Sequence, residues 1–131
     1  MIPDVMYAVT TREFRFVEAI LRGYARFTVK GASYPGIIPE ADAVTEGIIY
    51  FNVDELSLER LDIFEGDLYQ RTPTRAETER EAILNAETYV VKPEYGDYLS
   101  LQKWDVEEFV QNSLEAFLNT YKGFTQHSYP S

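Results

Sequence analysis

The spacing of hydrophobic residues predicts short helices and strands that follow one another along the chain. Pro3 to Val9 carries apolar residues on one side at helical spacing, with a proline in the first turn, which predicts a short helix. From Ala19 to Lys30 the period becomes two, which predicts a strand with one apolar and one polar face. Tyr34 to Gly36 predicts a turn, and Pro39 to Ala43 continues it as a loop.

The middle of the chain predicts a buried strand followed by a capped helix. Val44 to Val53 is apolar and β-branched on both faces, which is typical of a strand covered on both sides. The next apolar positions recur every three residues, which indicates a short helix. Asp54 or Ser57 is suited to cap its start, and Gly66 is suited to the position just after its end.

A hairpin and a loop are expected next. Tyr69 to Ala76 and Ala82 to Val91 read as two strands joined by a charged turn. Pro73 places the first of these strands at an edge or at a bulge, because proline donates no ladder hydrogen bond. Glu94 to Lys103 shows no clear period and predicts a loop.

The clearest helix is expected near the C-terminus. Asp105 and Glu108 have capping-box spacing, and Gly123 is suited to end the helix. Strands separated by short helices, with a helix at the end, indicate an α+β domain over residues 1–123 and a C-terminal tail over 124–131. One helical stripe carries the apolar residues Val106, Phe109, Val110, Leu114, Phe117, Leu118 and Tyr121, together with Ser113.

The amino-acid composition argues against several classes of function. The net charge of −10 argues against nucleic acid and membrane surfaces as partners, because both are anionic. Ten Tyr and eight Phe among 131 residues suit strands and a pocket lining. There are no cysteines, no signal-peptide pattern and no apolar run long enough for a membrane span, so we expect a cytoplasmic protein.

Most familiar catalytic groups are missing. The single histidine, His127, lies in the tail, and neither metal-ligand spacing nor a glycine-rich phosphate loop is present, so we expect no cofactor. Arg22, Arg26 and Lys30 alternate on one strand face. They could attract an anionic ligand, but a solvated face is the simpler interpretation. Chemistry would have to depend on carboxylates, tyrosines, basic side chains and backbone amides.

Glu65 is the best candidate for a catalytic group. It is expected at the C-terminal end of a helix, where the helix dipole disfavours a negative charge. Phe64 and Tyr69 are expected close by and would desolvate the carboxylate. Both effects raise the pKa toward neutrality, where a carboxyl group can accept and return a proton. The alternative is an exposed glutamate before a glycine cap, with Tyr69 and Arg71 as ordinary strand residues.

The segment Leu61–Arg71, LDIFEGDLYQR, resembles the LDxFEGxxYxR signature of the γ-glutamylcyclotransferase-like (AIG2-like) family. Further blocks agree in order and spacing over nearly the whole chain. They are Gly23–Gly31 with GYxRxxVKG, Tyr34–Pro39 with YPGIxP, Val44–Tyr50 with VxGxLY, Ala86–Val90 with AxxYV, and Trp104-Asp105 with the plant-like members.

The resemblance implies a small mixed β-barrel flanked by helices and, in active members, an acyltransferase or lyase reaction. The α-amino group of a small γ-glutamyl compound attacks its own γ-carbonyl group and releases 5-oxoproline and an amine or amino acid. This intramolecular step needs a base, an acid and a bent substrate. Glu65 matches the family's catalytic glutamate. Tyr34, Tyr69 and Tyr89 are candidates for pocket walls and hydroxyls and Arg71 for orienting a carboxylate, with a structural role as the alternative for each.

One family feature is missing. The family begins with a strand and a YGTL or YGSL loop whose backbone amides hold the glutamyl group, and residues 1–5 align just after that loop. We therefore expect the first strand to be absent and a sheet edge to be open, with possible self-association through it. Two hypotheses remain: an enzyme whose true start lies upstream, or a non-catalytic binding or regulatory domain on the same fold.

Overall fold

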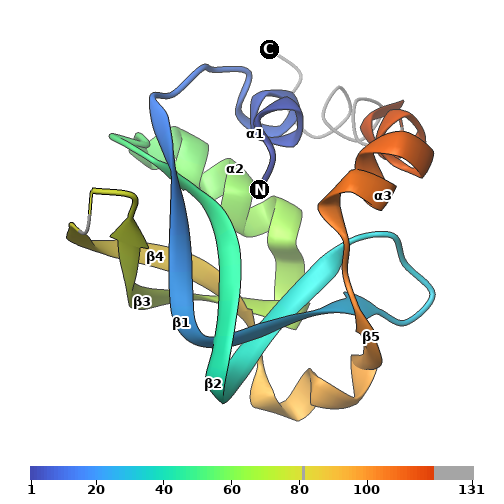
Figure 1. Cartoon of the computed structure of the whole chain (residues 1–131). Helices are drawn as coiled ribbons and strands as arrows, with labels where there is room; N and C mark the ends of the chain where they lie inside the picture. The colour runs from blue at the N-terminus through green and yellow to red at the C-terminus, as the bar shows by residue number, and fades with distance from the viewer. Residues whose placement is uncertain (81, 120–131) are drawn as a thin grey trace.

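Strands and short helices make up the computed structural model, which describes residues 1–80 and 82–119 (Figure 1). This arrangement confirms the α+β class, with helices beside one antiparallel sheet. In chain order the elements are α1 (Pro3–Thr10), β1 (Phe16–Val29), β2 (Pro35–Tyr50), α2 (Glu55–Glu65), η1 (Gly66–Leu68), β3 (Tyr69–Thr78), β4 (Ile83–Val91), η2 (Pro93–Tyr98), β5 (Leu99–Lys103) and α3 (Val106–Asn112), where η marks a 3₁₀ helix.

Several elements confirm the sequence prediction closely. The expected first helix is α1, and the expected hairpin is β3 and β4. Asp54 caps α2, because its side chain accepts a hydrogen bond from the backbone N–H of Ser57. Gly66 follows the last residue of α2 with a φ of 74°, a conformation that glycine adopts without the steric cost of a Cβ atom.

Strand β1 is the centre of the sheet. It pairs with β2 along its whole length, from Phe16↔Tyr50 to Thr28↔Pro35. At one end it pairs with β3, and at the other end with β5. Within the described residues the path is open and runs β2-β1-β3-β4, with β5 beside β1 and every pair antiparallel. The long β1–β2 ribbon bends strongly, which gives the sheet a barrel-like shape (Figure 1).

The predicted loop Pro39 to Ala43 is wrong, because strand β2 runs through it. The register between β1 and β2 shifts where Gly23 faces residues 40–43, and both Gly23 and Asp42 have positive φ. This region is therefore a bulge within a strand, not a break between strands. Pro35 and Pro39 fit in β2 because it lies at the end of the strand path, where a missing N–H costs no ladder bond.

Two apolar clusters hold the helices and strands together. The first joins α1 to α2 through Val5, Val9 and Leu61. The second joins the ends of β1, β4 and β5 through Val29, Val91 and Leu99. The expectation that the strand from Val44 onward is covered on both faces is wrong: Val44 is 49% exposed, and Ile48 and Ile49 are not fully buried.

The C-terminal part of the described chain departs most from the sequence prediction. Most of the expected loop Glu94–Lys103 forms η2 and strand β5. The expected single helix is interrupted at Ser113 and resumes over residues 114–119. Phe109 is buried as the stripe predicts, whereas Val106 and Val110 are exposed. The predictions that concern Tyr121, Gly123, His127 and the tail lie outside the described residues.

Candidate active site

Glu65 is the last residue of α2, and its side chain is partly buried. Burial raises the pKa of this carboxyl group to about 7; the α-ammonium group of Met1 opposes the shift and the charge of Asp62 adds to it. The expected direction of the pKa shift is thus confirmed, with burial as its largest cause. No hydrogen bond or ion pair of the Glu65 carboxylate is found among residues 1–80 and 82–119. A carboxylate without a fixed partner is free to exchange protons.

Two tyrosines lie close enough to Glu65 to feel its charge. Burial, and then the negative charge of Glu65, raise the pKa of Tyr69 well above the usual value. The Tyr69 hydroxyl donates a hydrogen bond of 2.6 Å to the backbone oxygen of Pro35. The pKa of Tyr89 is also raised, mainly by burial and by its hydrogen bond to Asp62, with a contribution from Glu65. The structure therefore brings Tyr69 and Tyr89 together around Glu65 as neutral, oriented hydroxyl groups.

Arg71 reaches Glu65 only indirectly. Its Nη1 lies 3.7 Å from Asp62 Oδ2, and its Nε lies 3.5 Å from Glu87 Oε2. Asp62 also accepts a 2.5 Å hydrogen bond from the Tyr89 hydroxyl through its Oδ1. This chain of contacts fixes Tyr89 beside α2, one helical turn before Glu65. Two carboxylates already share the positive charge of Arg71.

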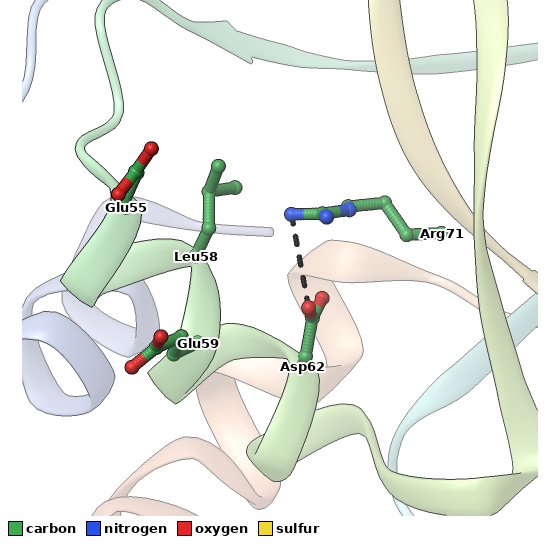
Figure 2. Close-up of a pocket in the computed structure, with 5 residues that line it drawn as sticks. All are labelled: Glu55, Leu58, Glu59, Asp62 and Arg71. Carbon is green, nitrogen blue, oxygen red and sulfur yellow. Dashed lines mark ion pairs between the residues drawn. The ribbon is translucent and has the colours of Figure 1, made fainter.

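A shallow cavity of about 200 Å³ lies between α2 and β3. Figure 2 shows Arg71 reaching from its strand toward Asp62 on the helix. The cavity is lined by Glu55, Leu58, Glu59, Asp62 and Arg71, so its charged wall is mainly acidic. Glu65 does not line this cavity. Asp62 does line it, and the charge of Asp62 also raises the pKa of Glu65.

The first residue of the chain lies beside Glu65. The α-amino group of Met1 is buried, and burial lowers its pKa; the nearby charge of Glu65 opposes this change, and the charge of Arg26 favours it. The backbone oxygen of Met1 accepts a 2.7 Å hydrogen bond from the Tyr50 hydroxyl. The segment in front of α1 therefore enters the site. No pattern in the sequence indicates this, because the contact joins residues about 65 positions apart.

Aromatic rings cover the neighbourhood of Glu65, and Phe117 is central among them. Its ring centroid lies 5.9 Å from that of Phe64, 6.5 Å from that of Tyr34 and 5.6 Å from that of Phe109. Trp104 extends the group, with its ring 5.5 Å from that of Phe109. We call these five residues the aromatic cluster. Tyr34 contacts the aromatic cluster through Phe117, and it contributes to the raised pKa of Tyr69.

Arg26 departs from the expectation of a solvated strand face. Arg22 is exposed and paired with Glu77, and Lys30 is exposed, as that expectation requires. Arg26 is instead partly buried, with its guanidinium carbon 5.0 Å from the centre of the Trp104 ring. Its Nη1 donates a 2.9 Å hydrogen bond to the backbone oxygen of Glu46. The solvated-face interpretation is therefore wrong for Arg26.

Two structural findings concern metals and membranes. In the described ranges 1–80 and 82–119, no group of three or more His, Cys, Asp or Glu side chains is arranged to hold a metal ion. No helix within those same ranges has the length and apolar character needed to cross a membrane.

Known proteins share both sequence and fold with this chain. The family model described as "Gamma-glutamyl cyclotransferase, AIG2-like" matches residues 2–106. AIG2-like protein C from Arabidopsis thaliana is 32% identical over 131 residues, which covers 95% of this chain and 73% of that protein. AIG2-like protein D from the same plant is 31% identical over 129 residues. The match covers 96% of this chain and 84% of that protein.

Solved structures agree with these relatives. The solution structure of At3g28950.1 from Arabidopsis thaliana has a TM-score of 0.67 and 27% identity, and covers 98% of this chain and 78% of that one. A solved structure named gamma-glutamyl cyclotransferase has a TM-score of 0.56 and 11% identity. The match covers 91% of this chain and 79% of that one. The second comparison shows a shared fold.

Proposed function

Because the chain belongs to the γ-glutamyl cyclotransferase AIG2-like family, we propose that it cyclises the γ-glutamyl group of a small γ-glutamyl amine or amino acid. The products are 5-oxoproline and the free amine or amino acid. The single observation that carries the proposal is Glu65: a partly buried carboxylate with a pKa of about 7 and no fixed partner among the described residues.

The reaction divides into two proton transfers around one bond exchange. Glu65 accepts a proton from the substrate's α-ammonium group, and the free amine attacks the γ-carbonyl carbon. The bond from that carbon to the leaving nitrogen then breaks, and Glu65 returns the proton to the leaving nitrogen. The ring nitrogen loses its second excess proton to the released amine, so that the products are 5-oxoproline and the protonated amine. A pKa near 7 suits both transfers, because neither protonation state is strongly favoured at neutral pH.

The surrounding residues support this role. Tyr69 and Tyr89 remain neutral and supply walls, since their raised pKa values keep the hydroxyl protons in place. Arg71 acts through Asp62, which it holds next to the Tyr89 hydroxyl. Tyr34 closes the site from the side of the aromatic cluster. The substrate ends must be held together for the intramolecular attack, and these side chains are suited to do so.

The test is release of 5-oxoproline from γ-glutamyl amines and γ-glutamyl amino acids. It is applied to this chain and to any longer in-frame product of its gene. We expect Glu65→Gln to lower kcat by roughly 100- to 10,000-fold, the usual contribution of a general acid–base group. Asp67→Asn is the matched control, because Asp67 is an exposed acid two residues further on and lies outside the network around Tyr89 and Asp62. Full activity of Glu65→Gln would refute the role of Glu65.

A non-catalytic ligand-binding domain on the same fold is the second candidate. The observation that favours it is that Glu65 does not line the cavity beside α2. Saturable binding of 5-oxoproline without turnover of any γ-glutamyl compound would support this candidate and reject the enzyme.

A further inference from the structure

Within the described residues, the Arg26 guanidinium group has a buried N–H donor without an acceptor. None of the carboxylates in the described part of the chain lies within ion-pair distance of it, whereas Arg22 pairs with Glu77 and Arg71 with two acids. Its Nη1 donates to the backbone oxygen of Glu46, but its buried Nε has no hydrogen-bond partner among residues 1–80 and 82–119. A buried guanidinium N–H without an acceptor is costly and calls for an explanation.

The orientation of Arg26 is well defined. Its guanidinium group lies over the Trp104 ring, and Trp104 Nε1 donates a 2.7 Å hydrogen bond to the backbone oxygen of Ser33. The bulge at Gly23 comes just before it and shifts the register of β1 against β2. A planar guanidinium fixed on an aromatic face is well prepared to bind a carboxylate.

Arg26 and Glu65 lie at the two ends of one series of aromatic contacts. The aromatic cluster links them by successive ring contacts, from Trp104 beside Arg26 through Phe109 and Phe117 to Phe64. Phe64 is the neighbour of Glu65 in sequence. The α-amino group of Met1 also feels both the Glu65 carboxylate and the Arg26 guanidinium. The site therefore has a negative group on α2 and a positive group on β1.

We propose that Arg26 binds the α-carboxylate of the γ-glutamyl substrate, so that the protein accepts only γ-glutamyl compounds in which this carboxylate is free. The inference rests on the proposed function. The α-ammonium and α-carboxylate groups share one carbon atom, so a substrate that presents its ammonium group to Glu65 must place its carboxylate near a second group. Glu65 and Asp62 repel that carboxylate, and Arg26 attracts it.

Arg26 takes no part in the bond changes of the reaction. The α-nitrogen forms a bond to the γ-carbon, the bond to the leaving nitrogen breaks, and the proton passes through Glu65. The α-carboxylate is unchanged in the product. Arg26 consequently acts on substrate binding and on the orientation of the attacking amine, so its loss should raise KM more than it lowers kcat.

The first experiment compares two substrates on the unaltered protein. γ-Glutamyl methylamide has a free α-carboxylate and no carboxylate on its leaving group, and its α-carboxamide counterpart differs only in that position. We expect kcat/KM to be roughly 10- to 100-fold higher for the free carboxylate, the usual effect of a hydrogen-bonded charge. Equal kcat/KM values would overturn the assignment of Arg26 while leaving the proposed function intact.

The second experiment uses variants. Arg26→Gln should raise KM for the carboxylate substrate, leave the carboxamide almost unaffected and so remove the discrimination. Arg26→Lys should restore part of it, since the positive charge remains. Arg22→Gln is the matched control on the same strand, because Arg22 is exposed and paired with Glu77. Retention of the discrimination in Arg26→Gln would contradict the proposal.

A binding measurement separates this proposal from the proposed function. Trp104 is the only tryptophan of the sequence and lies against Arg26, so its fluorescence reports on a ligand there. We expect 5-oxoproline to change this fluorescence saturably and 5-oxoprolinamide to do so only at much higher concentration. If this fluorescence result were obtained without turnover of any γ-glutamyl compound, the proposed enzymatic function would be rejected. The assignment of Arg26 as a carboxylate-binding residue would be retained. An equal response to both compounds, or to neither, would overturn the site.

Discussion

At the scale of single residues, the environment of Glu65 decides its chemistry. Burial is the main reason for its raised pKa, and Asp62 adds to it, while the Met1 ammonium group opposes both. The two tyrosines whose pKa values the charge of Glu65 raises, Tyr69 and Tyr89, donate their hydroxyl protons to Pro35 and Asp62. Glu65 can therefore exchange protons near neutral pH, whereas the pKa values of Tyr69 and Tyr89 are far too high for this.

The same pKa shift makes stability depend on pH. The Glu65 pKa rises from an ordinary value near 4.5 to about 7, so between these values the folded protein binds more protons at this group than the unfolded chain. The free energy of unfolding therefore falls as pH rises through this window. Glu65→Gln should remove that slope and be more stable than the parent at pH 8, on the order of 2 to 3 kcal/mol.

Urea denaturation at pH 5, 6, 7 and 8 measures this effect. Asp67→Asn should keep the slope of the parent protein, since this exposed acid lies outside the buried site. Parallel pH profiles for the parent and Glu65→Gln would show that Glu65 has an ordinary pKa.

Part of the candidate site is predictable from the sequence. Glu65 could be identified because its helix position and its aromatic neighbours are local features of the chain. Tyr69 and Tyr89 also lie around it, as the resemblance implies. The sequence alone does not distinguish Arg26, because its regular alternation with Arg22 and Lys30 predicts a solvated face for all three. Only the contact with Trp104, 78 positions away, distinguishes it.

At the scale of elements, the close approach of β2 to β4 and β5 shapes the sheet. Gly36 in β2 lies against the side chains of Val91 and Leu99, so tightly that a Cβ atom there would be 2.5 Å from Val91 Cγ2 and 2.9 Å from Leu99 Cδ2. Both neighbours belong to the second apolar cluster. A side chain at this position would therefore have to displace these neighbours or the strand itself.

Gly36→Ala should therefore destabilise the fold by roughly 1 to 3 kcal/mol, the usual cost of overpacking a core. Gly47→Ala is the matched control in the same strand. Apart from its chain neighbours, no atom in the described part of the chain would lie within 4 Å of a Cβ atom at Gly47, and the φ of this residue is not positive. The urea midpoint measures both variants. A Gly36→Ala protein as stable as Gly47→Ala would show that β2 can move away from β4 and β5.

Elements with strong local patterns were predictable, and those fixed by distant partners were not. The caps of α2 and the β3–β4 hairpin follow from residues close in sequence. Strand β5 is short, and Leu101 on it is 99% exposed, so only its pairing with β1 makes it a strand. The bulge in β2 likewise depends on Gly23 in another strand, and the break at Ser113 interrupts an otherwise regular stripe.

At the scale of the whole molecule, the site is assembled from distant parts of the chain. The segment before α1, the end of α2, the β3–β4 hairpin and the C-terminal aromatic residues all contribute. The net charge of −10 opposes this compact arrangement, because like charges are brought together on folding.

Added salt should therefore stabilise the fold. Raising the sodium chloride concentration from about 0.01 M to about 0.15 M shortens the Debye length from about 30 Å to about 8 Å and should raise Tm by roughly 2 to 5 °C. Choline chloride should act equally, because screening does not depend on the cation. A Tm that is unchanged or lower in both salts would show that net repulsion does not limit stability.

The burial of the Met1 nitrogen beside Glu65 has a practical consequence for protein production. Any residue attached in front of Met1, such as an affinity tag, converts its ammonium group into an uncharged amide. The group that lowers the Glu65 pKa is then lost, and the added chain begins inside the site. Preparations with and without such an extension should therefore differ in the pKa of Glu65, which is expected to be higher in the extended one.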